Sequence, residues 1–171
     1  ECGHPIIALS RDAVSLGVAG AEFADIQPDS ITITCDLADR ADIAAAAEQI
    51  KAKTTWIAGI VHNAGIISPI KSMADVDRAN WARNIQINLV GVQDLTNRLI
   101  PLLGGKEQSR ITTISSGASL RAISGWSAYC VAKAGLDMWA KCMAEEGAES
   151  NISAISIAPG IVDTDMQKTI R

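Results

Sequence analysis

The sequence lacks several features that would place it in other classes of protein. Fifteen Lys and Arg residues stand against nineteen Asp and Glu, and the basic residues are scattered, which argues against a nucleic-acid partner. No apolar run approaches the length of a membrane span, and the first residues lack the basic-then-apolar layout of a signal peptide. We therefore expect a cytoplasmic protein with no membrane and no nucleic-acid partner.

Metal-ligand spacing is also missing from the sequence. The four cysteines form no paired motif, and Cys35 and Cys130 fall in apolar segments where a free thiol packs as a small hydrophobe. His62 has no His or carboxylate partner at ligand spacing, so we interpret it as a structural histidine. With 171 residues, 48% of them hydrophobic, the sequence predicts one globular domain, residues 1–171, and no metal site.

Short β-branched runs alternate with segments of helical composition along the whole chain. Strands are expected at residues 6–9, 31–35, 57–61, 111–115 and 152–157. Helices are expected up to residue 24, at 39–52 with Asp39 as N-cap, at 76–103 and from 126 onward. This alternation predicts an α/β fold with a parallel sheet covered on both faces, in which ligands bind beyond the carboxyl ends of the strands.

Three polar residues follow the strand at 111–115 with a spacing that suits proton transfer. Tyr129 and Lys133 lie four residues apart, hence on one face of the expected helix, and Ser116 ends the strand. A nearby ammonium lowers the pKa of a phenol, so Lys133 could activate Tyr129. Ser116 could donate a hydrogen bond to a substrate oxygen that gains negative charge. A Tyr with a Lys four positions on is weak evidence alone and could belong to an ordinary helix.

Further motifs stand at other strand ends in a recognisable order. Asn63-Ala64-Gly65, Asn88, Ser116, Tyr129 with Lys133, and Pro159-Gly160 together resemble the short-chain dehydrogenase/reductase family over nearly the whole chain, and within it the sepiapterin reductase and benzil reductase branch. The resemblance implies a Rossmann-like doubly wound fold that binds NAD(P), with Asn88, Ser116, Tyr129 and Lys133 as catalytic residues.

The resemblance also assigns cofactor contacts to the first half of the chain. Ser10 and Arg11 correspond to the positions near the adenosine ribose, and an Arg there suits a 2′-phosphate, which favours NADPH over NADH. Alternatively, Arg11 is an exposed arginine at a helix start. Asp36 and Leu37 correspond to the adenine-contacting pair, although Asp36 could equally be a turn or capping residue.

Nearer the nicotinamide, the resemblance implies five groups of contacts. Small residues after the strand at 57–61 let the backbone pass close to a ribose, and Asn88 would disturb its helix and hold a water that relays protons to the lysine. The implied contacts are Asn63, Ala64 and Gly65, Asn88, Tyr129, Lys133, and the segment with Pro159, Gly160, Val162 and Thr164. A plain turn would also account for Pro159-Gly160.

One family motif is missing. The glycine-rich turn that cradles the pyrophosphate does not occur in the sequence, and both ends look cut, so we expect a partial domain that lacks the first strand and the C-terminal part. That first strand would lie between the strands at 6–9 and 57–61, and its absence would leave a gap in the sheet.

The functional hypothesis is an NADPH-dependent carbonyl reductase acting on a ketone or diketone of sepiapterin or benzil type. The alternatives are a 3-oxoacyl or steroid-type reductase, or a non-catalytic truncated member that acts by association. Apolar residues surround the helix after 126, which suggests a homodimer through the helices around Leu95 and Leu136.

Overall fold

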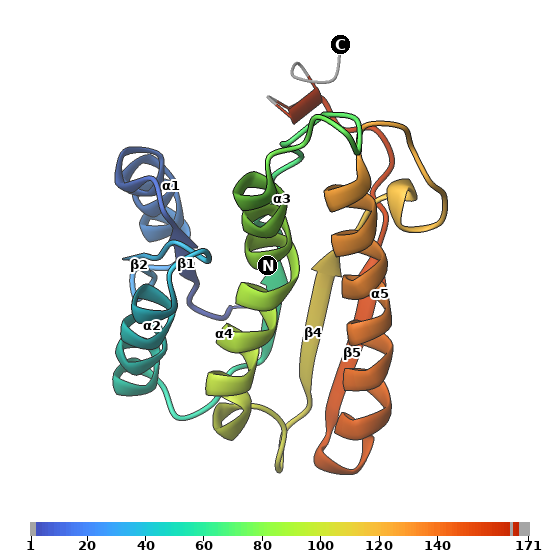
Figure 1. Ribbon diagram of the computed structural model, residues 1–171. Coiled ribbons are helices and arrows are strands. Elements are labelled where there is room, and N and C mark those ends of the chain that lie inside the picture. Colours follow the sequence, from blue (N-terminus) through green and yellow to red (C-terminus); the bar gives the residue numbers. More distant parts are fainter. Residues whose placement is uncertain (1–2, 165, 168–171) are drawn as a thin grey trace.

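The computed structural model describes residues 3–164 and 166–167 (Figure 1). Strands and helices alternate as predicted. The strands are β1 (Ile7–Ser10), β2 (Ile31–Thr34), β3 (Gly59–His62), β4 (Ser109–Ile114) and β5 (Ile152–Ile157). The α-helices are α1 (Ala13–Ile26), α2 (Arg40–Lys53), α3 (Arg78–Ile85), α4 (Gly91–Leu99) and α5 (Ser127–Gly147).

All strand pairs in the described residues are parallel, which confirms the predicted α/β fold. The strands form two sheets, one with the order β1-β2 and one with the order β3-β4-β5. No hydrogen-bonded ladder joins β1 to β3 within this part of the chain. The predicted gap between the first and third strands is therefore confirmed.

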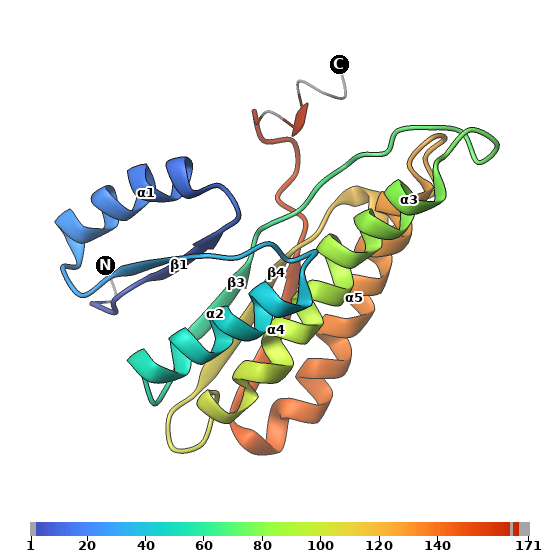
Figure 2. The same ribbon diagram turned by 60° about the vertical axis from the view of Figure 1, so that its left-hand side comes forward.

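The helices cover the strands unequally. Parallel crossovers are right-handed, so the chain places α1 on one side of the strands, and α2, α4 and α5 on the other (Figure 2). On the face away from α4 and α5, Val61 is 66% exposed and Ile155 is 51% exposed. These two side chains remain exposed because, among the described residues, helices cover β3-β4-β5 on the side of α4 and α5 (Figure 2).

The core lies between the sheets and the helices α2, α4 and α5. One hydrophobic cluster packs the first sheet against the helices, because Ile33 of β2 and Ile43 of α2 contact Leu95 and Leu99 of α4. Cys35 is buried in the same cluster and burial raises the pKa of its thiol to about 11, which confirms that it packs as a small hydrophobe.

The long helix expected at 76–103 is not continuous. After α3 the chain forms a π-helical segment, Gln86–Val90, before α4 begins, and a 3₁₀ turn, Ile100–Leu102, follows α4. Asn88 sits in the middle of the π segment and is fully buried. Its side chain is hydrogen-bonded to the backbone of Ile66. Short π-helical segments within α-helices are frequent at functional sites.

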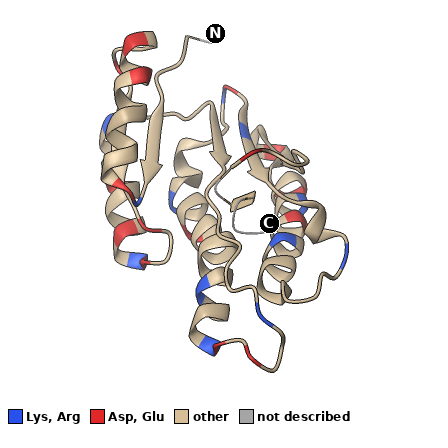
Figure 3. Ribbon diagram, turned by 90° about the horizontal axis from the view of Figure 1, so that it is seen from above, with Lys and Arg blue, Asp and Glu red and all other residues tan. Residues whose placement is uncertain are grey.

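Local signals at the second helix are confirmed. Asp39 caps α2 by accepting hydrogen bonds from the backbone amides of Ala41 and Asp42, and Asp42 lies in the first turn. The positions of Lys and Arg and those of Asp and Glu are interspersed along the ribbon (Figure 3). Among the described residues, no helix has the length and apolar character that crossing a membrane requires.

Candidate active site

Ser116 lies just beyond the carboxyl end of β4, with Ser115 between them, at the strand end where it was predicted. It caps the short 3₁₀ turn Gly117–Ser119, and its Oγ accepts a hydrogen bond from the Ala118 amide at 3.2 Å. The capping contact uses a lone pair of Oγ, so the hydroxyl proton stays available to donate. The turn packs on α5, which brings Ser116 to the start of the helix that carries Tyr129.

Tyr129 and Lys133 lie on the inner face of α5, also as predicted. Their side chains are only 5% and 4% exposed. The Lys133 ammonium lies 5.7 Å from the centroid of the Tyr129 ring and donates a hydrogen bond to the Ile114 carbonyl at 2.7 Å. The end of β4 therefore anchors Lys133 beside the tyrosine that precedes it by one helical turn.

The predicted lowering of the Tyr129 pKa is wrong for this arrangement. Burial raises the pKa of Tyr129 above its ordinary value, and a hydrogen bond with Ser116 only partly offsets this. Burial also lowers the pKa of Lys133 to about 8, opposed by the charge of Asp137. The ammonium lies over the ring of Tyr129 and donates its hydrogen bond to the Ile114 carbonyl.

Asn88 and Gly65 meet Lys133 from the neighbouring elements. The Asn88 Oδ1 accepts a hydrogen bond from the Ile66 amide at 2.9 Å, and Nδ2 donates to the Ile66 carbonyl at 2.8 Å. A Cβ added to Gly65 would lie 2.9 Å from Asn88 Oδ1 and 3.6 Å from Lys133 Nζ. Glycine suits this position because a side chain would press against Asn88 Oδ1.

Asn63 and Ala64 precede Gly65 in the exposed loop after β3, at the predicted strand end. His62, the last residue of β3, is buried, forms a 2.7 Å hydrogen bond with Thr96 Oγ1 and meets Trp139 edge to face. The prediction of a structural histidine is confirmed.

The residues assigned to the adenosine end also lie at carboxyl ends of strands. Ser10 ends β1, and its hydroxyl oxygen accepts a hydrogen bond from the Asp12 amide. Arg11 is exposed, and its charge contributes to lowering the pKa of Asp12 and of Asp36, behind the hydrogen bonds that these carboxylates accept. Asp36 accepts a bond from the Ala38 amide at 2.9 Å, which is the turn role left open by the sequence. Leu37 follows it.

The segment after β5 lies at the same edge as the other strand ends. Pro159, Gly160, Val162 and Thr164 are exposed. Among the described residues no side-chain hydrogen bond joins them to the catalytic side chains. Met166 is the described residue of this segment that reaches Tyr129, with its sulfur 4.0 Å from the phenol oxygen.

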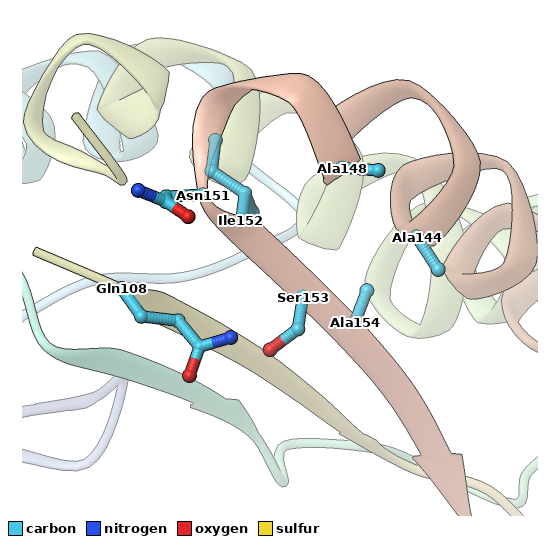
Figure 4. A pocket seen from close by; sticks show the side chains of 7 residues that line it. All are labelled: Gln108, Ala144, Ala148, Asn151, Ile152, Ser153 and Ala154. Atoms are coloured by element: carbon cyan, nitrogen blue, oxygen red, sulfur yellow. The ribbon is translucent and has the colours of Figure 1, made fainter.

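The described residues form shallow hollows on the surface, two of which show where the site lies. One, of about 320 Å³, borders the loop after Ser116 and is lined by Ala118, Leu120, Arg121 and Cys130 among others. The other, of about 230 Å³, lies between the amino end of β5 and the end of α5, where Gln108 and Ser153 face it (Figure 4). The second hollow contains none of the predicted site residues, because strand beginnings lie at the opposite edge from strand ends.

The sequence-based predictions did not include four residues that hold these side chains in place. Asn84 bonds Asn88 through its side chain, and Arg83 pairs with Asp36 at 3.2 Å. Gly91 lets α4 approach Leu37, since a Cβ there would lie 2.3 Å from the Leu37 carbonyl oxygen. Asp137 accepts a bond from Ser156 of β5. An interior helical glycine is a recognised sign of close approach, whereas nothing in the sequence distinguishes the other three.

The model of the short chain dehydrogenase family matches residues 1–171, the whole chain. The chain belongs to the short-chain dehydrogenase family. Among curated relatives, the benzil reductase ((S)-benzoin forming) of Saccharomyces cerevisiae is 38% identical over 141 residues, which cover 80% of this chain and 54% of that protein. A benzil reductase ((S)-benzoin forming) of Bacillus cereus is 36% identical, covering 66% of this chain and 46% of that protein.

Solved short-chain dehydrogenases have the same fold. The crystal structure of the KRED1-Pglu enzyme superposes with a TM-score of 0.87 at 32% identity, covering 98% of this chain and 67% of that one. The resemblance to the benzil reductase branch of the family is confirmed by these relatives. The chain spans about half the length of the curated relatives it matches.

Proposed function

We propose that the protein is an NADPH-dependent short-chain carbonyl reductase that reduces a ketone or diketone of benzil or sepiapterin type. The observation that carries the proposal is the convergence of Ser116, Tyr129 and Lys133, two of them almost fully buried, at one strand end. Buried polar side chains of this kind are costly to maintain, so their shared location favours a catalytic role over an accidental one.

The surroundings of Tyr129 favour an apolar substrate. Tyr129 packs in a cluster with Ile67 and Ala118, and Ile70, Ile123 and Trp126 lie against the cluster. Trp126 meets the Tyr129 ring edge to face at a centroid distance of 6.0 Å. Aromatic and aliphatic walls with one proton donor suit an aryl ketone or diketone better than a charged substrate. The names of the benzil reductase relatives support the same class.

Each catalytic residue has a defined task in this proposal. The Tyr129 hydroxyl gives its proton to the substrate oxygen, while the Ser116 hydroxyl donates a hydrogen bond to the same oxygen as charge develops. Because burial raises the pKa of Tyr129, the proton is well retained until the substrate oxygen becomes basic. The Lys133 ammonium stabilises the phenolate that remains and holds a cofactor ribose. Asn88 supports proton supply to Lys133.

The residues present fit the nicotinamide and adenosine ends of NADPH, which when bound supplies the hydride. The missing side chain at Gly65 leaves backbone accessible between Asn88 and Lys133. Arg11 is exposed and forms no ion pair within the described residues, so its guanidinium can take a 2′-phosphate. Further contacts are proposed for Ser10, Asp36, Leu37, Asn63, Ala64, Pro159, Gly160, Val162 and Thr164. The pyrophosphate contact is assigned to no residue of this sequence.

The test is Tyr129→Phe in the full-length protein with benzil and NADPH. Loss of the proton donor should lower kcat by about a hundredfold or more, with NADPH affinity nearly unchanged. Ser116→Ala should lower kcat as well. Activity of Tyr129→Phe within a few-fold of wild type would exclude the Tyr129 assignment. A 3-oxoacyl thioester and a steroid ketone, assayed beside benzil, separate the alternative reductase classes.

The proposed homodimer forms through the helices around Leu95 and Leu136, as the sequence indicated. Leu95 and Leu136 themselves are buried within the chain, 6% and 1% exposed, so exposed side chains of these helices would make the contact. On α5, Val131 and Met138 are 52% and 59% exposed and lie two turns apart on one face. We place the proposed contact there. Met138→Glu should convert a dimer to a monomer in analytical ultracentrifugation, and an unchanged mass would exclude this face.

A further inference from the structure

Asn84 is a buried residue without an assigned role. It lies in the last turn of α3, and its side chain is 0% exposed. Its Nδ2 donates hydrogen bonds to the carbonyl oxygens of Ile66 at 3.1 Å and Ser68 at 2.8 Å. Its Oδ1 accepts a hydrogen bond from Asn88 Nδ2 at 2.8 Å. The amide group of Asn84 therefore bonds α3 to the loop after β3, beside the two bonds that Asn88 makes to Ile66.

The backbone acceptors fix which way both amides point. Asn84 faces two carbonyl oxygens, which can only accept, so its nitrogen must point at the loop and its oxygen at Asn88. Asn88 then has both Nδ2 protons engaged, one by Asn84 and one by the Ile66 carbonyl. Asn88 Oδ1 is left facing the Ile66 amide and the Gly65 backbone, on the side of Lys133.

The same loop reaches the catalytic tyrosine. Ile67 stands between the two carbonyls that Asn84 bonds, and it is buried in the cluster around Tyr129. Among the described residues Asn84 forms no hydrogen bond with Tyr129 or Lys133. The groups that it bonds do lie beside them, since Ile67 packs with Tyr129 and Asn88 Oδ1 and Lys133 Nζ both lie close to Gly65. Asn84 of α3 and Asn88 of the π-helical segment face each other, because their side chains are hydrogen-bonded.

We propose that Asn84 is a positioning residue, which fixes Asn88 and the backbone of Ile66 to Ser68 as one unit and thereby sets Ile67 against Tyr129 and Asn88 Oδ1 toward Lys133. The proposal rests on the proposed carbonyl reductase function. Without Asn84, the Ser68 carbonyl loses its side-chain donor and one proton of Asn88 Nδ2 loses its acceptor. Buried groups left without partners reorganise, which moves the loop and the Asn88 amide together.

The main experiment is a double-mutant cycle of Asn84→Ala and Asn88→Ala in the full-length protein with NADPH and benzil. Displacing a supporting group by about 1 Å can cost up to roughly a hundredfold in rate, so Asn84→Ala should lower kcat by at least about tenfold. The NADPH dissociation constant should change far less than kcat. The double variant should be no slower than Asn88→Ala, because the two residues act as a unit.

Asn80→Ala is the matched control, since Asn80 is exposed and lies one turn earlier on α3. It should leave kcat unchanged. Losses that multiply in the double variant would overturn the proposal, as would a kcat of Asn84→Ala equal to that of the control. If Asn84→Ala does not fold, Asn84→Ser takes its place in the cycle, because its hydroxyl still offers Asn88 an acceptor and the loop one donor.

A second readout does not depend on activity. Hydrogen exchange of the Asn88 side-chain amide, followed by nuclear magnetic resonance, should be slow in the wild type and faster in the Asn84 variant, while Asn80→Ala should match the wild type. Unchanged exchange would overturn the proposal even if the variant melts at a lower temperature. A wild-type protein that reduces no carbonyl substrate would instead refute the proposed function, and the exchange result would still decide the role of Asn84.

Discussion

Protonation of His62 is expected to destabilise the folded protein in mild acid. Thr96 Oγ1 donates its proton to the Val92 carbonyl at 2.9 Å, so His62 Nε2 must be the donor in its 2.7 Å bond with Thr96. The neutral ring is therefore satisfied at Nε2, and a second proton would place a positive charge inside the core beside Trp139. Burial accordingly lowers the pKa of His62 from 6.5 to about 4.

The pKa of His62 is about 4 in the folded chain and 6.5 in the unfolded chain, and this difference sets the sign and size of the effect on stability. Between about pH 6.5 and pH 4 the unfolded chain binds the proton and the folded chain does not, so the free energy of unfolding rises with pH over this window. The stability is fully present above pH 6.5 and is lost as the pH falls toward 4. At 1.36 kcal/mol per pH unit, the loss across the window is about 3 kcal/mol. A single-domain protein has a total stability of only about 5 to 15 kcal/mol, so this loss is measurable.

The assay is urea denaturation of the full-length protein at about pH 7.5 and about pH 4.5, with His62→Gln as the variant. Glutamine keeps an N–H that can bond Thr96 but cannot be protonated in this range. The free energy of unfolding should fall by about 2 to 3 kcal/mol more in the wild type than in His62→Gln. His4→Gln, a change at the exposed histidine, should behave as the wild type. Equal losses in the wild type and in His62→Gln would refute the reasoning.

Further predictions concern the cofactor and the close approaches around it. Arg11→Ala should lower the affinity for NADPH by about tenfold or more and the affinity for NADH little, since only NADPH carries the 2′-phosphate. An equal loss of affinity for both cofactors in fluorescence titrations would exclude that role of Arg11. Gly65→Ala should lower kcat and NADPH affinity together, because its Cβ would lie 2.9 Å from Asn88 Oδ1 and push the loop outward. Gly91→Ala should destabilise the protein by roughly 1 to 3 kcal/mol in denaturant melts, because its Cβ would meet the Leu37 carbonyl oxygen at 2.3 Å.

Gly17→Ala is the matched control for the two glycine substitutions. Gly17 lies inside α1, and a Cβ added there meets nothing within 4 Å. Alanine is the better helix former, so this change should raise the stability by up to about 1 kcal/mol. Equal effects at Gly17 and Gly91 would show that helix propensity, rather than the contact with the Leu37 carbonyl, sets the result.

The sequence alone determined what depends on near neighbours along the chain. The alternation of β-branched and helical segments predicted the parallel α/β fold, and Asp39 predicted the start of α2. The four-residue spacing of Tyr129 and Lys133 predicted their shared helix face, and both are buried on it. These features follow from the periodicity of helices and strands, which requires no knowledge of distant residues.

Only the tertiary structure decided what surrounds those residues. The pKa of Tyr129 is raised because distant segments bury it, whereas the sequence suggested a lowering by Lys133. The π-helical segment arises where Asn88 bonds the backbone of Ile66, 22 residues away. The positioning role proposed for Asn84 likewise depends on its hydrogen bonds to the carbonyls of Ile66 and Ser68 in that loop. Such contacts join residues far apart in the chain, so burial, hydrogen-bond partners and pKa values depend on how the elements pack and cannot be inferred from near neighbours along the chain.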